Sequence, residues 1–245
     1  MDIQPPFGYS AIVPLNRTQK VRLLKQGEVP EFARRLNAVP ISYTEFALVA
    51  REYPIVFTMA RDSQIYSPVA VLGMTAGENL FDAGGDWVRN VYVPAYVRRF
   101  PFCMAKVAID KVEQQNRLIC VEKAHVDEAG EPMFDAEGKP LAKWNEIETL
   151  LKEYEIDLER SRELCGILTD YGLFEPFTMQ AKFVKGGDPL NMTGMHRVAE
   201  AKIEHLNASQ LKNLVKKGIL ARVYAHLLSL DNFAKLLDRR ATNLN

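Results

Sequence analysis

An arginine pair surrounded by aromatic residues is the part of this sequence with the clearest chemical potential. The stretch "YVPAYVRRFPF", residues 92–102, holds two arginines and four aromatic rings and contains no acid. Guanidinium groups bind carboxylates and phosphates through paired hydrogen bonds, and aromatic faces stack on flat ligands or cations. These residue types predict a site for an anionic or aromatic ligand. Its candidate residues are Tyr92, Tyr96, Arg98 and Arg99.

The same stretch also has a purely structural interpretation. In a strand, neighbouring side chains face opposite sides, so at most one of the two arginines faces a given pocket unless the chain turns there. Pro94 and Pro101 can stiffen an edge or a bend, while Val93, Val97 and the aromatic rings pack into a core. We therefore expect one arginine to pair with a buried acid and the other, Arg98, to be exposed.

Two residues outside this stretch are further candidates for the ligand site. Trp87 follows a Gly-Gly turn and can either bind a ligand or cover the end of a core, because tryptophan buries a large area. Glu45 can serve as an acid or base beside the arginines. It also ends the sequence "SYTE", residues 42–45, which predicts a capping box at the start of a helix over about 43–52.

Signatures of established catalytic and metal sites are missing from the sequence. The four histidines have no metal-binding spacing, and there is no HExxH, P-loop, GxGxxG or GxSxG motif. The acidic turns "DAGGD" and "DEAGE" do not continue into a calcium-binding loop. The three cysteines are widely spaced, which predicts buried thiols and no disulfide framework. We expect no metal and no cofactor.

Composition limits the partners and the compartment. Lysine plus arginine equals aspartate plus glutamate at 31 each, and this balance argues against a nucleic-acid partner. The first residues lack the pattern of a secretory signal, and the apolar runs are too short to cross a bilayer. These features predict a cytoplasmic protein without membrane insertion.

Several short apolar runs rich in β-branched residues predict strands. Residues 54–59 and 67–74 have the pattern of a hairpin or a meander, and two further strands are expected at 101–110 and 117–124. Residues 173–184 are also expected to be extended, with a turn at 186–189. A short strand can follow that turn. These runs indicate a mainly antiparallel sheet.

Helical periodicity appears in the second half of the chain. Apolar residues recur every three to four positions from residue 147 to residue 168, which predicts a long helix at about 143–171 that Gly172 ends. The sequence "NASQ", residues 207–210, predicts a capping box and a helix that ends before Gly218. The next helix places five residues on one packing stripe. They are Leu220, Val223, Tyr224, Leu227 and Leu228.

These elements predict the α+β class. A mainly antiparallel sheet from the N-terminal and middle segments would pack with the long helix and a C-terminal helical segment. Residues 1–245 are expected to form a single domain, which is β-rich over 1–141 and helical and mixed over 142–245.

Four segments of the chain resemble the bacterial SapC family. They are "YPIVFT" (53–58), "GENLFDAGGDWVRNVYVPAYVRRFPF" (77–102), "TGMHRVAEAKIEHL" (193–206) and "GILARVYAHLLSL" (218–230). Two departures stand out: Phe100 replaces a more usual tyrosine, and Met195–His196 stands where Leu–Tyr is expected. The resemblance implies a link to bacterial surface-layer or outer-envelope systems, and it carries no catalytic residues over.

The sequence leaves three functions open. The first is a non-enzymatic protein that binds a small molecule or peptide and serves such an envelope system. The second is an enzyme, or an enzyme's partner, acting on a peptide, a sugar or an amino-acid-derived molecule through a pocket with Tyr92, Tyr96, Arg98 and Trp87, with Glu45 as acid or base. The third is a homo-oligomer that buries the tyrosines of 92–96 or the C-terminal helices between chains.

Overall fold

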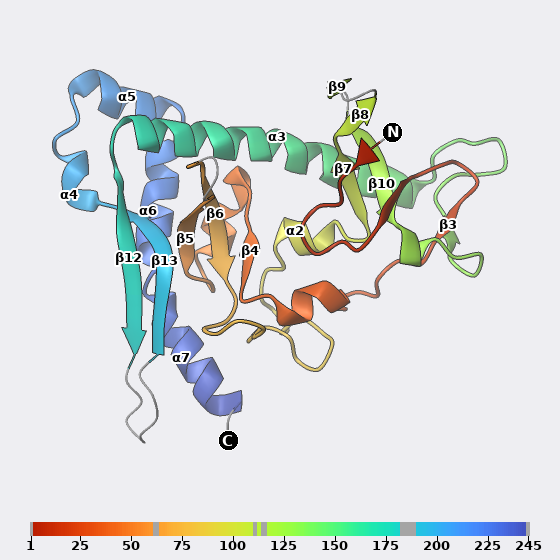
Figure 1. The fold of residues 1–245 in the computed structure, drawn as a ribbon, viewed down its shortest axis with the longest axis horizontal. Helices are drawn as coiled ribbons and strands as arrows, with labels where there is room; N and C mark the ends of the chain where they lie inside the picture. Colours follow the sequence, from red (N-terminus) through yellow and green to blue (C-terminus); the bar gives the residue numbers. More distant parts are fainter. Residues whose placement is uncertain (1, 61–63, 110–111, 114–116, 182–189, 244–245) are drawn as a thin grey trace. The chain divides into compact units, whose positions relative to one another are not determined.

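The protein is a mixed α+β structure built from helices and several antiparallel sheets, as predicted (Figure 1). The computed structural model describes residues 2–60, 64–109, 112–113, 117–181 and 190–243. These residues form two compact units, each assembled from three segments. Unit 1 consists of residues 1–34, 82–89 and 95–156, and unit 2 of residues 35–81, 90–94 and 157–245.

The described residues of unit 1 form three small antiparallel sheets. The central sheet has the order β2 (Ile12–Pro14), β10 (Leu118–Glu122), β7 (Phe102–Ala105). The second sheet has the order β1 (Asp2–Ile3), β8 (Val107–Ile109), β9 (Val112–Glu113), and the third pairs β3 (Lys20–Val21) with β11 (Glu131–Pro132). The strand predicted at 101–110 is therefore two strands in two different sheets. Single helical turns complete the unit: η1 (Glu31–Arg35), α2 (Ala95–Arg98) and η3 (Lys123–His125).

Strand alternation divides the core of unit 1 into two clusters. Phe102 pairs with Val121 across β7 and β10, and both side chains pack with Trp144 and Leu151. The next pair along, Cys103 and Cys120, points to the opposite face because successive strand residues alternate. That face forms a cluster with Tyr9 and Ala105. All three cysteines are free and buried, as the sequence predicted.

Unit 2 contains a five-stranded antiparallel sheet of order β12-β13-β5-β6-β4. Its strands are β4 (Ala38–Pro40), β5 (Ile55–Met59), β6 (Tyr66–Val71), β12 (Phe174–Ala181) and β13 (Leu190–Val198). The predicted antiparallel pair is confirmed as β5 and β6, and the described part of the predicted extended segment is confirmed as β12. The turn predicted at 186–189 lies outside the described residues. Strands β12 and β13 run side by side as the long edge hairpin in Figure 1.

Helices complete unit 2, and helix α3 (Ala142–Asp170) belongs to both units. Its bounds agree with the predicted 143–171, and Gly172 adopts the positive φ of 66° typical of a helix C-terminus. The other helices are η2 (Tyr43–Glu45), α1 (Phe46–Val49), α4 (Glu200–Ile203), α5 (Ala208–Lys216), α6 (Ile219–Ser229) and α7 (Asn232–Asn243). The helix expected over about 43–52 is thus shorter. Among the described residues, no helix is long and apolar enough to cross a bilayer.

The packing stripe predicted for helix α6 is partly wrong. Its buried residues are Ile219, Val223, His226 and Ser229, which lie toward β5 and β13. Tyr224 and Leu228 of the predicted stripe are exposed instead. The sequence predicted a helix with the right period, but it placed the buried face on the wrong side of the helix. The true buried face carries a histidine and a serine, which a search for apolar residues does not include.

We propose that residues 1–245 fold as a single cooperative domain. Each unit is assembled from three segments that alternate with segments of the other along the chain. Trp87 and Trp144, the two tryptophans of the chain, both belong to unit 1, while helices α5, α6 and α7 belong to unit 2. We expect urea unfolding curves followed by tryptophan fluorescence and by far-UV circular dichroism to coincide. Two separated transitions would instead show independently folding units.

Candidate functional site

The aromatic and arginine stretch forms a helical turn, not the strand considered from sequence. Helix α2 begins directly after Pro94, and the Arg99 N–H donates to the Ala95 carbonyl oxygen at 3.0 Å. Proline is tolerated at the start of a helix because the first N–H groups have no intrahelical acceptor. The two arginines still diverge, since helical neighbours differ by about 100° in direction. Arg98 is exposed and Arg99 is 4% exposed, which confirms the expected order of exposure.

Arg99 is held inside unit 1 by aromatic rings and an ion pair. Its guanidinium carbon lies 4.2 Å from the centre of the Tyr96 ring, 4.8 Å from that of Tyr154 and 5.7 Å from that of Tyr9. A carboxylate oxygen of Glu155 is 4.0 Å away and also pairs with Arg117. The predicted pairing of one arginine with an acid is confirmed, although Glu155 is partly and not fully buried. Arg99 and its ring partners thus form part of the interior.

Tyr92 and Glu45 contact each other in unit 2. The Tyr92 hydroxyl donates to Glu45 Oε1 at 3.0 Å, and the backbone N–H and hydroxyl of Ser42 each donate to Glu45 Oε2 at 2.7 Å. The predicted capping box of Ser42 and Glu45 is present. Glu45 is 3% exposed. Its carboxylate therefore fixes the start of η2 and the position of Tyr92.

Trp87 lies in unit 1 beside the Gly-Gly turn. Gly84 and Gly85 both have positive φ, and the Trp87 N–H donates to the Gly27 carbonyl oxygen at 2.7 Å. The side chain is buried. This placement agrees with the interpretation of Trp87 as a residue that covers a core. Of the six candidates, Tyr96 and Arg99 meet in one cluster and Tyr92 and Glu45 in another.

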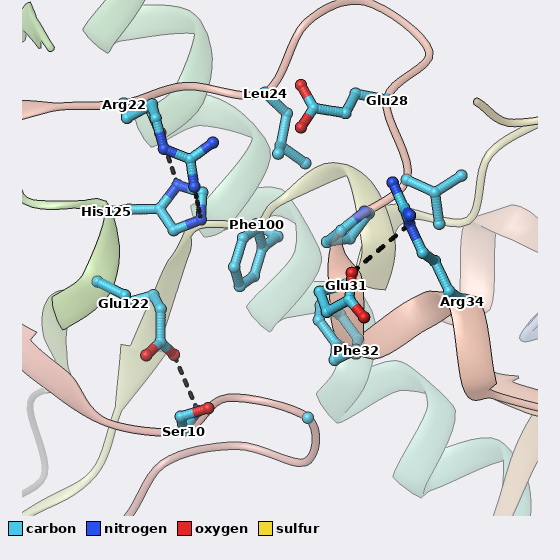
Figure 2. A pocket seen from close by; sticks show the side chains of 14 residues that line it. Ser10, Arg22, Leu24, Glu28, Glu31, Phe32, Arg34, Phe100, Glu122 and His125 are labelled. Atoms are coloured by element: carbon cyan, nitrogen blue, oxygen red, sulfur yellow. Dashed lines mark hydrogen bonds and ion pairs between the residues drawn. The ribbon is translucent and has the colours of Figure 1, made fainter. Parts of the chain in front are cut away.

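A cavity of about 480 Å³ in unit 1 gathers charged and aromatic side chains that sequence reasoning missed (Figure 2). Of the stretch 92–102, only Phe100 lines this cavity. The other residues used below come from three short segments around β3, η1 and β10 to η3: Arg22, Glu28, Glu31, Phe32, Arg34, Glu122 and His125. The volume falls in the range of pockets for small organic molecules.

His125 orients the guanidinium of Arg22 at one side of this cavity. His125 Nδ1 is 2.6 Å from the Arg22 carbonyl oxygen, so it carries the proton and donates. Nε2 is then the acceptor for Arg22 Nη2, at 3.0 Å. The buried imidazole thus uses both nitrogens on the same arginine. Arg22 is exposed and prepositioned, with its remaining N–H groups available to an anion.

Glu122 is likewise engaged in structural hydrogen bonds. Its two carboxylate oxygens accept from the backbone N–H groups of Ser10 at 3.0 Å and Ala11 at 3.1 Å. These bonds attach the N-terminal segment to the end of β10. Glu122 is buried, so the bonds replace the water that the carboxylate loses. It is therefore a poor candidate for a general base.

Aromatic rings form the apolar wall of the cavity. Phe100 and Phe32 lie with ring centres 5.4 Å apart, and Phe100 meets the His125 ring edge-on at 4.8 Å. In Figure 2 these rings lie between Arg22 on one side and Arg34 on the other. Gly8 permits the close approach of the N-terminal segment, since a Cβ there would lie 2.4 Å from Phe32 Cδ2. The wall offers flat surface for an apolar or aromatic group.

The rim of the cavity carries both signs of charge. Arg34 Nε lies 3.8 Å from a carboxylate oxygen of Glu31, and Glu28 accepts from the Lys25 N–H at 2.9 Å. Arg22, Glu28 and Arg34 also line a neighbouring hollow of about 540 Å³. The cavity and this neighbouring hollow therefore share a polar rim, and Arg22, Arg34 and Lys25 all face it. No sequence signal indicated this, because the segments carry no motif or period.

The described residues offer little for metal or nucleophilic chemistry. Within this part of the chain, no group of three or more His, Cys, Asp or Glu side chains is placed to bind a metal ion. Burial raises the pKa of Cys103 to about 12 and that of Cys120 to about 11. Both remain thiols at neutral pH, and a thiol is a weak nucleophile.

The chain belongs to the SapC family. It matches the family described as SapC over residues 16–236, which covers nearly the whole chain and includes every cavity residue named above except Gly8 and Ser10. No curated protein and no solved structure matches it. The sequence-based resemblance is thereby confirmed at the level of the family.

Proposed function

We propose that this protein is a non-enzymatic binding protein of the cytoplasm that serves a bacterial surface-layer or outer-envelope system. Its ligand would occupy the cavity of unit 1. The observation that carries this proposal is the arrangement of two arginines around an aromatic wall, in a cavity whose buried titratable groups are already engaged. Membership of the SapC family supports the envelope link.

The chemistry of the cavity selects a class of ligand. Arg22 and Arg34 favour a carboxylate or phosphate group, since guanidinium donors match these anions. Phe32 and Phe100 favour a flat or apolar portion beside it. A small organic anion, or a short peptide with a free carboxylate, satisfies both. The carboxylates of Glu28 and Glu31 at the rim can also attract a cationic group on the same ligand.

Binding is favoured over catalysis because the potential acids and bases are occupied. His125 uses both ring nitrogens on Arg22, and Glu122 uses both oxygens on backbone N–H groups. A general base must reach the proton that it removes, and here each would first have to give up a buried hydrogen bond. Neither Arg98 nor Arg99 lines the cavity, so the arginine anchor of the enzyme hypothesis is not found there.

Native mass spectrometry of the protein purified from its own host tests this function. We expect a bound molecule that is retained by the wild type and lost from the double variant Arg22→Gln/Arg34→Gln, because losing two guanidinium contacts costs about 3–6 kcal/mol, a loss of a hundredfold or more. Arg17→Gln is the matched control, since Arg17 is exposed and belongs to the same unit without lining the cavity.

The outcomes separate binding from catalysis. Thermal melts of each variant establish that it is folded. If the double variant keeps the molecule at wild-type occupancy, the cavity is not its site. If the protein converts the molecule into a product and the double variant does not, the protein is an enzyme and the binding function is wrong.

A further inference from the structure

Residues 207–230, which form helices α5 and α6, carry a strong local excess of positive charge. They contain Lys212, Lys216, Lys217 and Arg222 and no aspartate or glutamate, in a chain whose charges balance at 31 each. A stretch of this length would carry about three acids at the average acid content of the chain, which is 31 of 245 residues. This stretch therefore carries four cations and no acid of its own.

Large apolar side chains are exposed on the same two helices. Leu211 and Val215 of α5 are 40% and 58% exposed, and Tyr224 and Leu228 of α6 are 43% and 72% exposed. Each pair has i, i+4 spacing, so its members lie on one face of their helix. Helix α6 buries a different face against the sheet. These four side chains are not needed by the core.

The cations beside them are available to a partner. Lys212 and Lys216 are exposed, and within the described chain neither makes an ion pair. Lys217 pairs with Glu163, and the Arg222 guanidinium lies 4.2 Å from the centre of the Tyr43 ring. Two lysines thus flank the apolar side chains of α5 without an acid to neutralise them.

We propose that the outer face of α5 and α6 binds reversibly to an anionic lipid surface. The outer face denotes the exposed side chains of the two helices that carry the proposal: Leu211, Lys212, Val215, Lys216, Tyr224 and Leu228. Apolar side chains that protrude from a helix insert among lipid headgroups, and lysines beside them are attracted to anionic lipids. Nothing in this inference depends on the ligand cavity of unit 1.

Charge and shape favour a lipid surface over other occupants. A two-fold contact with a second copy would bring two positively charged faces together, which is unfavourable. The four apolar side chains protrude, and none of them lines the nearby hollow at Tyr43 and Lys217. A partner helix would need a groove to receive it, whereas a fluid bilayer requires no matching shape. An acidic protein remains an outcome of the test.

Co-sedimentation of the full-length protein with vesicles tests the proposal. We expect binding to vesicles of equal parts phosphatidylcholine and phosphatidylglycerol, and little binding to phosphatidylcholine alone. Lys212→Gln/Lys216→Gln is expected to weaken binding about 25-fold, near fivefold per lysine. Val215→Ser/Leu228→Ser is expected to weaken it at least tenfold, because two apolar groups no longer insert.

Matched controls distinguish this face from any exposed residue. Ile65→Ser replaces an apolar side chain that is 55% exposed, and Lys123→Gln/Lys139→Gln removes two exposed lysines elsewhere. Both should bind as the wild type does. Absence of wild-type binding, equal binding to neutral vesicles, or binding that survives both face variants would each overturn the proposal. So would concentration-dependent dimers lost in the Val215→Ser/Leu228→Ser variant, or an acidic protein that co-purifies through this face, if vesicles are not bound.

Discussion

Replacing Arg99 by alanine is expected to lower the free energy of unfolding by about 3–5 kcal/mol, whereas the same change at Arg98 should alter it by no more than about 0.5 kcal/mol. Arg99 is enclosed by three tyrosine rings and lies beside Glu155, while Arg98 is exposed. Removing the guanidinium leaves a cavity between the rings. It also takes one of the positive charges away from Glu155, which pairs with Arg117 as well.

Two further variants separate the causes of this loss. Arg99→Met nearly fills the volume of the arginine side chain. The stability that this variant still loses therefore measures the contribution of the positive charge and of its contact with the rings. Arg99→Lys keeps the charge but lacks the planar group that stacks on Tyr96 and Tyr154, so it should lie between wild type and alanine. Urea unfolding with an unchanged slope measures each value. Equal losses at Arg98 and Arg99 would contradict a structural role specific to Arg99.

The contrast between these neighbours shows what the sequence could predict about the stretch 92–102. Residue chemistry predicted one buried and one exposed arginine, and Arg98 is the exposed one. It did not predict the helical turn, because Pro94 and Pro101 are also typical of an edge strand or a bend. The tyrosine rings around Arg99 come partly from residues 9 and 154, which no local pattern links to it.

Local signals predicted the helices well for a physical reason. The apolar period of helix α3 is set within the helix itself, and the capping box of Asn207 and Gln210 involves residues three apart. Gly172 and Gly218 have the positive φ values expected of residues that end helices. Each of these features depends on neighbours along the chain, so the sequence contains the information in readable form.

The ligand cavity could not be predicted in the same way. His125 meets Arg22 across 103 residues, and Glu122 meets Ser10 across 112. These encounters depend on how β2, β7 and β10 pair, and the pairing of strands distant in sequence leaves no local signature. Phe100 was visible within its conspicuous stretch, but the arginines of the cavity were not. Four of the six candidate residues therefore came from the stretch 92–102, which is rich in aromatic residues and arginine. Most of the cavity is built by other segments, and Phe100 is the residue of this stretch that lines it.

Acidification should destabilise the protein through His226, the second large effect that we expect. The ring is fully buried in unit 2, with Nδ1 2.8 Å from the Ile55 carbonyl oxygen and Nε2 accepting from the Val198 N–H at 3.1 Å. Burial lowers its pKa from 6.5 to about 4, and the charge of Arg197 acts in the same direction. The neutral ring connects β5 and β13 through these two hydrogen bonds. A second proton would occupy Nε2 and break the hydrogen bond from the Val198 N–H.

The direction of the pH effect follows from proton binding. Between pH 6.5 and pH 4 the unfolded chain binds a proton at His226 and the folded chain does not. The stabilisation is therefore complete above pH 6.5, decreases as the pH falls, and is lost below pH 4. A shift of this size corresponds to about 3 kcal/mol.

His226→Gln tests this assignment because glutamine keeps one donor and one acceptor but does not titrate. We expect the variant to have a lower free energy of unfolding than wild type at pH 7.5. Between pH 6.5 and pH 4, the decrease in its free energy of unfolding should be about 3 kcal/mol smaller than the decrease in wild type. Urea unfolding at a series of pH values measures both quantities. His205→Gln changes an exposed histidine and should keep the wild-type pH profile. If His226→Gln retained the full acid sensitivity of the wild type, another group would be the cause.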